Sequence, residues 1–158
     1  MRLIVIRHGV ATPKRRWDGS DEDRPLTGHG ARQAKALVGR LARYRPAEIL
    51  SSPSLRCRQT VEPLGARTAT TVQNRRLLGV DAGARAIELV HQLVTTQPPS
   101  ATVVMCTHRE VLVELLPALA VEFGGTLDHR PPGAKGSYWG LRFRDGRLVG
   151  AKYSRPDG

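Results

Sequence analysis

The stretch Leu3-Ile4-Val5-Ile6-Arg7-His8-Gly9 decides the fold of this 158-residue chain. Its four consecutive apolar residues predict a strand buried on both faces, as in a parallel sheet covered by helices. Ligands of such sheets bind beyond the carboxyl ends of the strands, which places Arg7 and His8 at the crevice. There a guanidinium can hold phosphate oxygens while an imidazole attacks or transfers protons. Gly9 allows a sharp exit of the backbone. The alternative is that His8 merely ends the strand and Arg7 is solvated.

Length and hydropathy predict one domain over residues 1–158, which is long enough to bury a core. No apolar run approaches the roughly 18 residues of a membrane span. The first residues do not resemble a signal peptide. We therefore expect a cytoplasmic protein that does not bind a membrane.

The net charge of +11 indicates an anionic partner. The cations are mostly scattered arginines, and their densest cluster is Lys14-Arg15-Arg16 beside Trp17. No zinc-finger spacing or aromatic RNA-binding strand is present, and aromatic residues make up only 4% of the chain. A small phosphorylated substrate is the simpler interpretation, and nucleic acid is disfavoured.

The two cysteines, Cys57 and Cys106, show neither metal-ligand spacing nor a disulfide framework. Arg56 and Arg58 flank Cys57 and can lower its thiol pKa. A buried, inert thiol is the alternative for Cys57. Cys106 lies within an apolar strand and is expected in the core.

Strands and helices are predicted to alternate along the chain, giving an α/β three-layer αβα sandwich with a mostly parallel central sheet and a C-terminal β-hairpin. The polar loop over residues 10–25 is long enough to be a lid or binding loop. Thr27 is expected to cap a helix whose apolar face includes Ala31. Ser52 or a neighbour should cap a second helix, with Pro53 in its first turn. The other predicted elements are strands 47–50, 70–72 and 102–106, helices 84–95 and 110–121, and a hairpin of 136–143 and 147–153 around Asp145-Gly146.

Two further residues fall on the same rim as Arg7 and His8. Arg56 lies in the first turn of the helix after the second strand, where a helix N-terminus favours anions. His108 follows the strand over 102–106 directly before a helix. Together the four residues predict a four-point phosphate site. The remaining histidines lack this setting and are expected on the surface or on helix faces: His29, His91 and His129.

These segments resemble the histidine phosphatase superfamily, the phosphoglycerate-mutase-like proteins. The motifs that carry the resemblance are Arg7-His8-Gly9, Arg24-Pro25-Leu26-Thr27-x-x-Gly30, Ser51-Ser52-Pro53-x-x-Arg56-x-x-Gln59-Thr60 and Thr107-His108. The resemblance implies a phosphoglycerate-mutase-like fold and a phosphatase with His8 as nucleophile, through a phosphohistidine. It implies that Arg7, Arg56 and His108 hold the phosphoryl oxygens. Neither a metal nor another cofactor is expected.

The general acid is where the chain departs from the larger family members. Those carry a glutamate soon after the third strand, whereas residues 76–81 here hold only Asp81 as an acidic residue. Asp81 is the possible general acid, with Asp18, Asp21 or Asp23 of the loop as alternatives. A phosphate or phosphoramidate leaving group can also depart with no acid. The small SixA-type phosphohistidine phosphatases are similar in length and also lack this glutamate.

A second resemblance, to the phosphatase half of bacterial MutT-type Nudix fusion proteins, comes from three groups of motifs. They are Trp17-x-Gly19 before Asp23-Arg24-Pro25-Leu26, Thr107-His108-x-Glu110-Val111, and Lys135-Gly136-Ser137-x-Trp139 before Asp145-Gly146-Arg147-Leu148. The resemblance implies a nucleoside di- or polyphosphate substrate and a functional link to a Nudix hydrolase.

The substrate-binding candidates are Lys14, Arg15, Arg16, Trp17 and Lys135. Trp17 can stack on a base while the adjacent cations meet a polyphosphate. A solvated basic loop, and strand packing beside a surface lysine, are the alternatives. Three other functions stay open: a SixA-type phosphatase of phosphohistidine proteins, a catalytically weak phosphate-binding protein, and a nucleic-acid binder driven by net charge.

Overall fold

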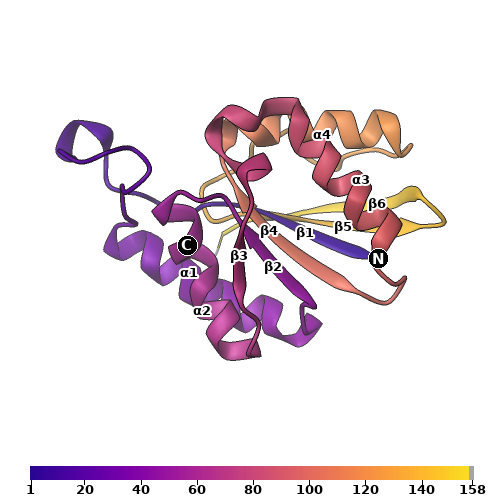
Figure 1. Ribbon diagram of the computed structural model, residues 1–158, viewed down its shortest axis with the longest axis horizontal. Coiled ribbons are helices and arrows are strands. Elements are labelled where there is room, and N and C mark those ends of the chain that lie inside the picture. Colours follow the sequence, from indigo (N-terminus) through magenta and orange to yellow (C-terminus); the bar gives the residue numbers. More distant parts are fainter. Residues whose placement is uncertain (157–158) are drawn as a thin grey trace.

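The computed structural model describes residues 1–156 and contains a central six-stranded sheet (Figure 1). The strand order is β3-β2-β4-β1-β5-β6. Neighbours among the first four strands run parallel, and β5 and β6 are antiparallel. The bounds of the strands are β1 (Arg2–Arg7), β2 (Glu48–Ser51), β3 (Val72–Asn74), β4 (Thr102–Thr107), β5 (Tyr138–Arg144) and β6 (Arg147–Ser154).

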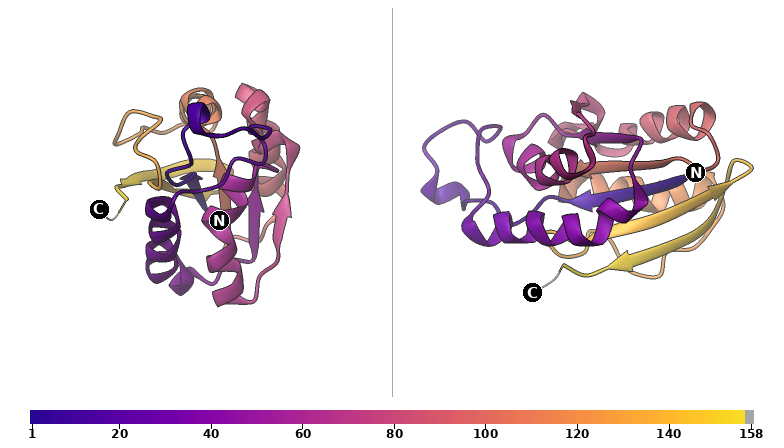
Figure 2. Two further views of the ribbon diagram at one scale, coloured as in Figure 1. Left: turned by 90° about the vertical axis from the view of Figure 1, so that its left-hand side faces the viewer. Right: turned by 90° about the horizontal axis from the view of Figure 1, so that it is seen from below.

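Four α-helices complete the three layers. They are α1 (Gly28–Leu41), α2 (Leu55–Thr68), α3 (Ala86–Thr96) and α4 (Arg109–Glu122). In Figure 1, α1 and α2 lie below the sheet and α3 and α4 above it, and both views of Figure 2 agree. Short 3₁₀ turns are η1 (Lys14–Arg16), η2 (Ala42–Tyr44), η3 (Arg76–Leu78) and η4 (Val80–Arg85). The predicted αβα sandwich and C-terminal hairpin are confirmed. Among residues 1–156, no helix combines the length and apolarity needed to cross a membrane.

The apolar run of β1 is continuous because successive side chains enter two different cores. Leu3 and Val5 pack in the core beneath α3 and α4, whereas Ile4 and Ile6 pack in the core with α1 and α2. All four are at most 1% exposed. Side chains alternate between the faces of a strand, so a strand covered on both sides has no polar position until it ends. That end is Arg7.

Several predicted boundaries were wrong by a few residues. The strand predicted over 70–72 is β3, which begins at Val72. The helix predicted from residue 84 begins at Ala86, because Gly83 adopts a left-handed conformation (φ 52°) and interrupts the helical backbone. Pro53 precedes α2 instead of lying in its first turn, and Ser54 is the N-cap residue. Ala31 is exposed, although it was expected on the apolar face of α1.

The start of α1 is fixed by a close backbone approach at Gly30. The Thr27 hydroxyl accepts a hydrogen bond from the Gly30 amide (3.1 Å), which confirms the predicted cap. A Cβ at Gly30 would lie 2.1 Å from the carbonyl oxygen of Val10. Only glycine therefore lets α1 pack against the backbone that follows His8.

We predict that Gly30→Ala destabilises the fold by roughly 2 kcal/mol or more, because α1 must move away from Val10. Gly39→Ala on the same helix is the matched control, since a Cβ there meets nothing within 4 Å. It should be neutral or stabilising by about 0.5–1 kcal/mol. Urea unfolding of both variants checks this, and equal stabilities would contradict the packing argument.

Candidate active site

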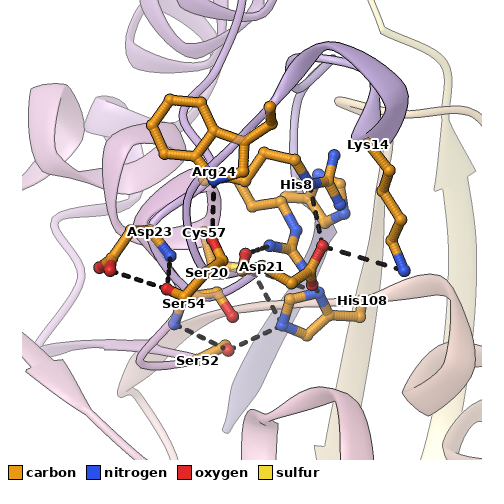
Figure 3. A network of polar contacts seen from close by, with 12 residues as sticks. His8, Lys14, Ser20, Asp21, Asp23, Arg24, Ser52, Ser54, Cys57 and His108 are labelled. Atoms are coloured by element: carbon orange, nitrogen blue, oxygen red, sulfur yellow. Dashed lines mark hydrogen bonds and ion pairs between the residues drawn. The ribbon is translucent and has the colours of Figure 1, made fainter.

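The parallel pairing of β1 and β4 brings the two predicted histidines together. Arg7 lies opposite Thr107 in the ladder, and the His8 amide donates to the Thr107 carbonyl (3.1 Å). His8 therefore follows the end of β1 while His108 follows the end of β4 and serves as the N-cap residue of α4. Their ring centroids are 5.3 Å apart (Figure 3).

His8 is held as a neutral imidazole with a defined tautomer. His8 is only 8% exposed, and its Nδ1 atom is 2.8 Å from the Gly9 carbonyl oxygen. A carbonyl can only accept, so Nδ1 carries the proton and Nε2 is left unprotonated. Burial, together with the charges of Arg56 and Arg7, lowers the pKa of His8 from 6.5 to about 4, although the Gly9 hydrogen bond acts in the opposite direction. At neutral pH, Nε2 thus has a free lone pair.

Arg7 and Arg56 supply guanidinium groups from two different elements. Arg7 is half-buried, and its Nη1 donates to the Gly133 carbonyl (2.5 Å). Burial, followed by the charge of Arg109, lowers the pKa of Arg7. Arg56 is 2% exposed in the first turn of α2. The Nε atoms of Arg7 and Arg56 are buried without a hydrogen-bond partner among residues 1–156.

His108 is fixed through both ring nitrogens. Nδ1 lies 3.3 Å from Nη2 of Arg56, which can only donate, so Nδ1 accepts and Nε2 carries the proton. Nε2 then donates to the Ser52 hydroxyl (2.7 Å). Burial, with the charges of His8 and Arg56, lowers the pKa of His108 to about 3. Its ring is therefore also neutral at neutral pH.

Both cysteines are buried, as the alternative interpretation of Cys57 predicted. The Cys57 sulfur lies 3.5 Å from Nε2 of His108 and contributes to the packing beneath that ring. Burial raises the pKa of the Cys106 thiol well above 9.0. Among residues 1–156, no group of three or more His, Cys, Asp or Glu side chains is arranged to hold a metal ion.

The carboxylate of Asp21, which lies in the loop over residues 10–25, forms an ion pair with the Arg56 guanidinium. Asp21 Oδ2 accepts from Arg56 Nη2 (2.9 Å), and the Asp21 carbonyl accepts from Nη1 (2.6 Å). The other carboxylate oxygen accepts from Arg24 Nε (2.9 Å), and Lys14 Nζ lies 3.9 Å away (Figure 3). Partial burial raises the pKa of Asp21, but the Arg24 hydrogen bond and these cations outweigh it, so the pKa is lowered. An anionic group thus already occupies one arm of the predicted phosphate site.

The other predicted binding residues are less uniformly placed. The Lys14 contact brings one loop cation to the site, and the Lys135 charge is near enough to lower the pKa of His8. Arg15 and Arg16 are exposed in η1. Trp17 Nε1 donates to the Ser20 carbonyl (2.8 Å) within the loop, which projects beyond the sheet in Figure 1.

Asp81, the suggested general acid, lies at the edge of the site. It is exposed in η4 and lines a hollow of about 480 Å³ together with Asp21 and Ser52. Ser52 directly contacts His108, so the hollow adjoins the buried ring. The three remaining histidines are exposed, as predicted: His29, His91 and His129.

Sequence reasoning missed Arg24 and Ser52 as members of the site. Arg24 Nη1 donates to the Thr12 carbonyl (2.7 Å), and its Nε holds Asp21. Thr60 was also unassigned, although its hydroxyl accepts from the Gly9 amide (3.0 Å) and fixes the backbone beside His8. All three residues lie in the quoted motifs, which were the available signal.

The geometry agrees with what comparison with known proteins finds. A family model described as "Histidine phosphatase superfamily (branch 1)" matches residues 3–79. An 8-oxo-(d)GTP phosphatase of Mycolicibacterium smegmatis is 33% identical over 158 residues, covering 98% of this chain and 48% of that protein. The chain therefore spans about half the length of this curated relative.

Two solved structures share the fold. SixA, a protein histidine phosphatase complexed with tungstate, has a TM-score of 0.74 at 20% identity, covering 98% of this chain and 94% of that one. A mycobacterial glucosyl-3-phosphoglycerate phosphatase complexed with VO3 has a TM-score of 0.78 at 22% identity, covering 99% of both chains. The matched motifs and the paired histidines agree with the family model over residues 3–79, and the solved structures share the fold, so the chain is similar to members of the histidine phosphatase superfamily.

Proposed function

We propose that the protein is a metal-independent phosphatase that transfers a phosphoryl group to His8 and then to water. The observation that carries this proposal is the neutral His8 ring, whose Nε2 is unprotonated beside two arginines with unpartnered Nε donors. A nucleophile needs the free lone pair, and the transferred group needs fixed positive charge around its oxygens. The site offers both without titrating any residue at neutral pH.

The reaction balances in two steps. Nε2 of His8 forms a bond to phosphorus, and the bond from phosphorus to the leaving oxygen breaks, with its electron pair departing on that oxygen. The oxygen of a water molecule then forms a bond to phosphorus, and the bond from phosphorus to Nε2 breaks with its electron pair returning to the ring, so that inorganic phosphate leaves and neutral His8 is restored. Arg7 and Arg56 hold the phosphoryl oxygens in both steps. The charge of a bound phosphoryl group raises the pKa of His108, so that its Nδ1 can become a third donor.

The proposed leading substrates are nucleoside di- or polyphosphates. Their leaving group is a phosphate, which needs little protonation, and this suits a site whose candidate acid, Asp81, is exposed at the edge. The cations around the loop, Lys14 with Arg15 and Arg16, supply charge for further phosphates. The 8-oxo-(d)GTP phosphatase to which the chain is similar supports this class. A separate Nudix hydrolase acting beside the protein stays a prediction.

Two alternatives have specific support. The shared fold with SixA favours a phosphatase of phosphohistidine proteins. The ion pair between Asp21 and Arg56 favours a protein that binds phosphate weakly and turns over slowly.

We predict that His8→Ala abolishes phosphate release, with a loss of roughly a thousandfold or more, because no other group replaces the nucleophile. Release is measured with EDTA present on nucleoside diphosphates, sugar phosphates and a phosphohistidine protein. His29→Ala, which removes an exposed histidine of α1, is the matched control and should keep full activity. The preferred compound ranks the substrate classes.

The outcomes separate the alternatives. Activity that persists in His8→Ala would overturn the assignment of the nucleophile. Labelled phosphate that stays on His8 without release would instead identify the binding protein.

A second prediction concerns the protonation of His8. Nitrogen-15 NMR of the imidazole should give a titration midpoint near 4, whereas the urea-unfolded chain should titrate near 6.5. Because folding lowers this pKa, protons bind more strongly to the unfolded chain. The contribution of His8 to stability is therefore present above pH 6.5 and is lost as the pH falls towards 4. A folded-state midpoint near 6.5 would show that the ring is not held neutral.

A third prediction follows from the ion pair between Asp21 and Arg56. Asp21→Asn should tighten competitive inhibition by inorganic phosphate by about threefold to tenfold, since the Arg56 fork no longer holds a competing carboxylate. Asp23→Asn is the control, because Asp23 pairs with Ser20 in the same loop and does not contact Arg56. Equal inhibition constants for both variants would show that Asp21 does not compete with phosphate.

A further inference from the structure

A basic groove lies between η2 and the β5–β6 hairpin, away from the candidate active site. A hollow of about 390 Å³ is lined by Arg2, Arg43, Arg142 and Lys152. The right-hand view of Figure 2 shows α1, which leads into η2, running alongside this hairpin. Arg2 precedes His8 by six residues of extended chain, so the groove lies about 20 Å from the nucleophile.

The sheet register forces two of these arginines together. Arg2 of β1 and Arg142 of β5 are directly opposite partners in the antiparallel ladder, so their side chains leave the same face. Like charges in this arrangement destabilise a sheet. Lys152 adds a third cation on this face, because it lies opposite Gly140, two residues from Arg142.

The Tyr44 ring places a further cation, Arg43, close to Arg2. The Arg2 guanidinium lies 4.5 Å from the centroid of the Tyr44 ring, and the Arg43 guanidinium lies 5.0 Å from the same centroid. Each contact is favourable by itself. Their joint effect is to hold two positive groups close together on one tyrosine.

Among residues 1–156, no carboxylate pairs with these cations. The residues that line the hollow include no Asp or Glu, and none of its four cations forms an ion pair within the described part of the chain. A second hollow of about 680 Å³ shares Arg43 and adds Arg45 and Arg67, again without an acidic residue. No ion pair among residues 1–156 offsets the repulsion of these groups, so an anion from outside would stabilise them.

We propose that this basic groove is a second phosphate-binding site, which takes a ligand carrying several linked phosphates. Guanidinium groups bind phosphate oxygens through paired hydrogen bonds, and the two hollows that share Arg43 extend the site beyond a single phosphate. The exposed large apolar residues, Val113, Val121 and Val149, line neither hollow, which disfavours insertion into a membrane. Linked phosphates come from a single-stranded nucleic acid or from a free polyphosphate.

The test measures fluorescence anisotropy of a labelled oligothymidylate of roughly 12 nucleotides, and calorimetry with inorganic tripolyphosphate. The site variant is Arg43→Gln/Arg142→Gln/Lys152→Gln. The matched control, Arg32→Gln/Lys35→Gln/Arg147→Gln, removes as many exposed cations from positions that line neither hollow.

We expect the site variant to weaken binding at least about tenfold. The slope of the logarithm of the binding constant against the logarithm of the salt concentration should become shallower by roughly 0.7 for each phosphate contact that is lost. The control should change affinity by less than about twofold. Binding of the oligonucleotide identifies nucleic acid as the source, and binding of tripolyphosphate alone identifies a free polyphosphate. Failure of both probes, or equal weakening in the two variants, would overturn the proposal.

The stability of the site variant and its phosphatase activity are measured as well. The urea midpoint of the site variant should equal or exceed that of the wild type, since the variant removes like charges. A lower midpoint would show that these cations stabilise the fold without a ligand, which contradicts the proposal. Phosphate release at His8 should be the same in all three proteins, so the second site stands or falls separately from the proposed phosphatase activity.

Discussion

The parallel pairing of β1 with β4 is the constraint on which the candidate site depends. It aligns Arg7 with Thr107, and the bond from the His8 amide to the Thr107 carbonyl continues that register past the end of the ladder. Two histidines that are a hundred residues apart in the sequence therefore lie in ring contact. A shift of one residue in this register would turn one of the two side chains to the opposite face of the sheet.

Burial at the end of these strands determines the chemistry of the rings. Protonated imidazoles at this position would lie beside Arg7 and Arg56 with little water to solvate them, so both histidines remain neutral. The neutral state supplies a nucleophile, and the arginines keep the site attractive to anions. Asp21 shows this attraction directly, because the protein's own carboxylate occupies the guanidinium that the proposed substrate would use.

The sequence predicted those parts of the site that depend on strand ends. A buried run followed by Arg7-His8, and another followed by His108, place residues on a common rim by topology alone. Contacts that depend on where a loop folds back were not predictable in this way. The Asp21 carboxylate reaches Arg56 across 35 residues, and Ser52 turns towards His108 instead of capping α2. Serine is a common N-cap residue, so the local sequence around Ser52 predicts a helix cap. That local preference contains no information about the buried His108 ring nitrogen, which is the partner that the Ser52 hydroxyl binds in the folded protein.

The same limit applies to the positive charge. From composition, the arginines are scattered along the chain, and only the register of β1 with β5 shows that Arg2 and Arg142 share one face. Charges of one sign gathered without a partner weaken a fold, and a fold that retains them at two places needs a reason for each. At the carboxyl end of β1, the cations are explained by the proposed phosphoryl group, and the Asp21 carboxylate pairs with Arg56 in its absence. At the amino end of β1, no carboxylate among residues 1–156 pairs with the cations around Arg2, and their mutual repulsion is the argument for an external anion.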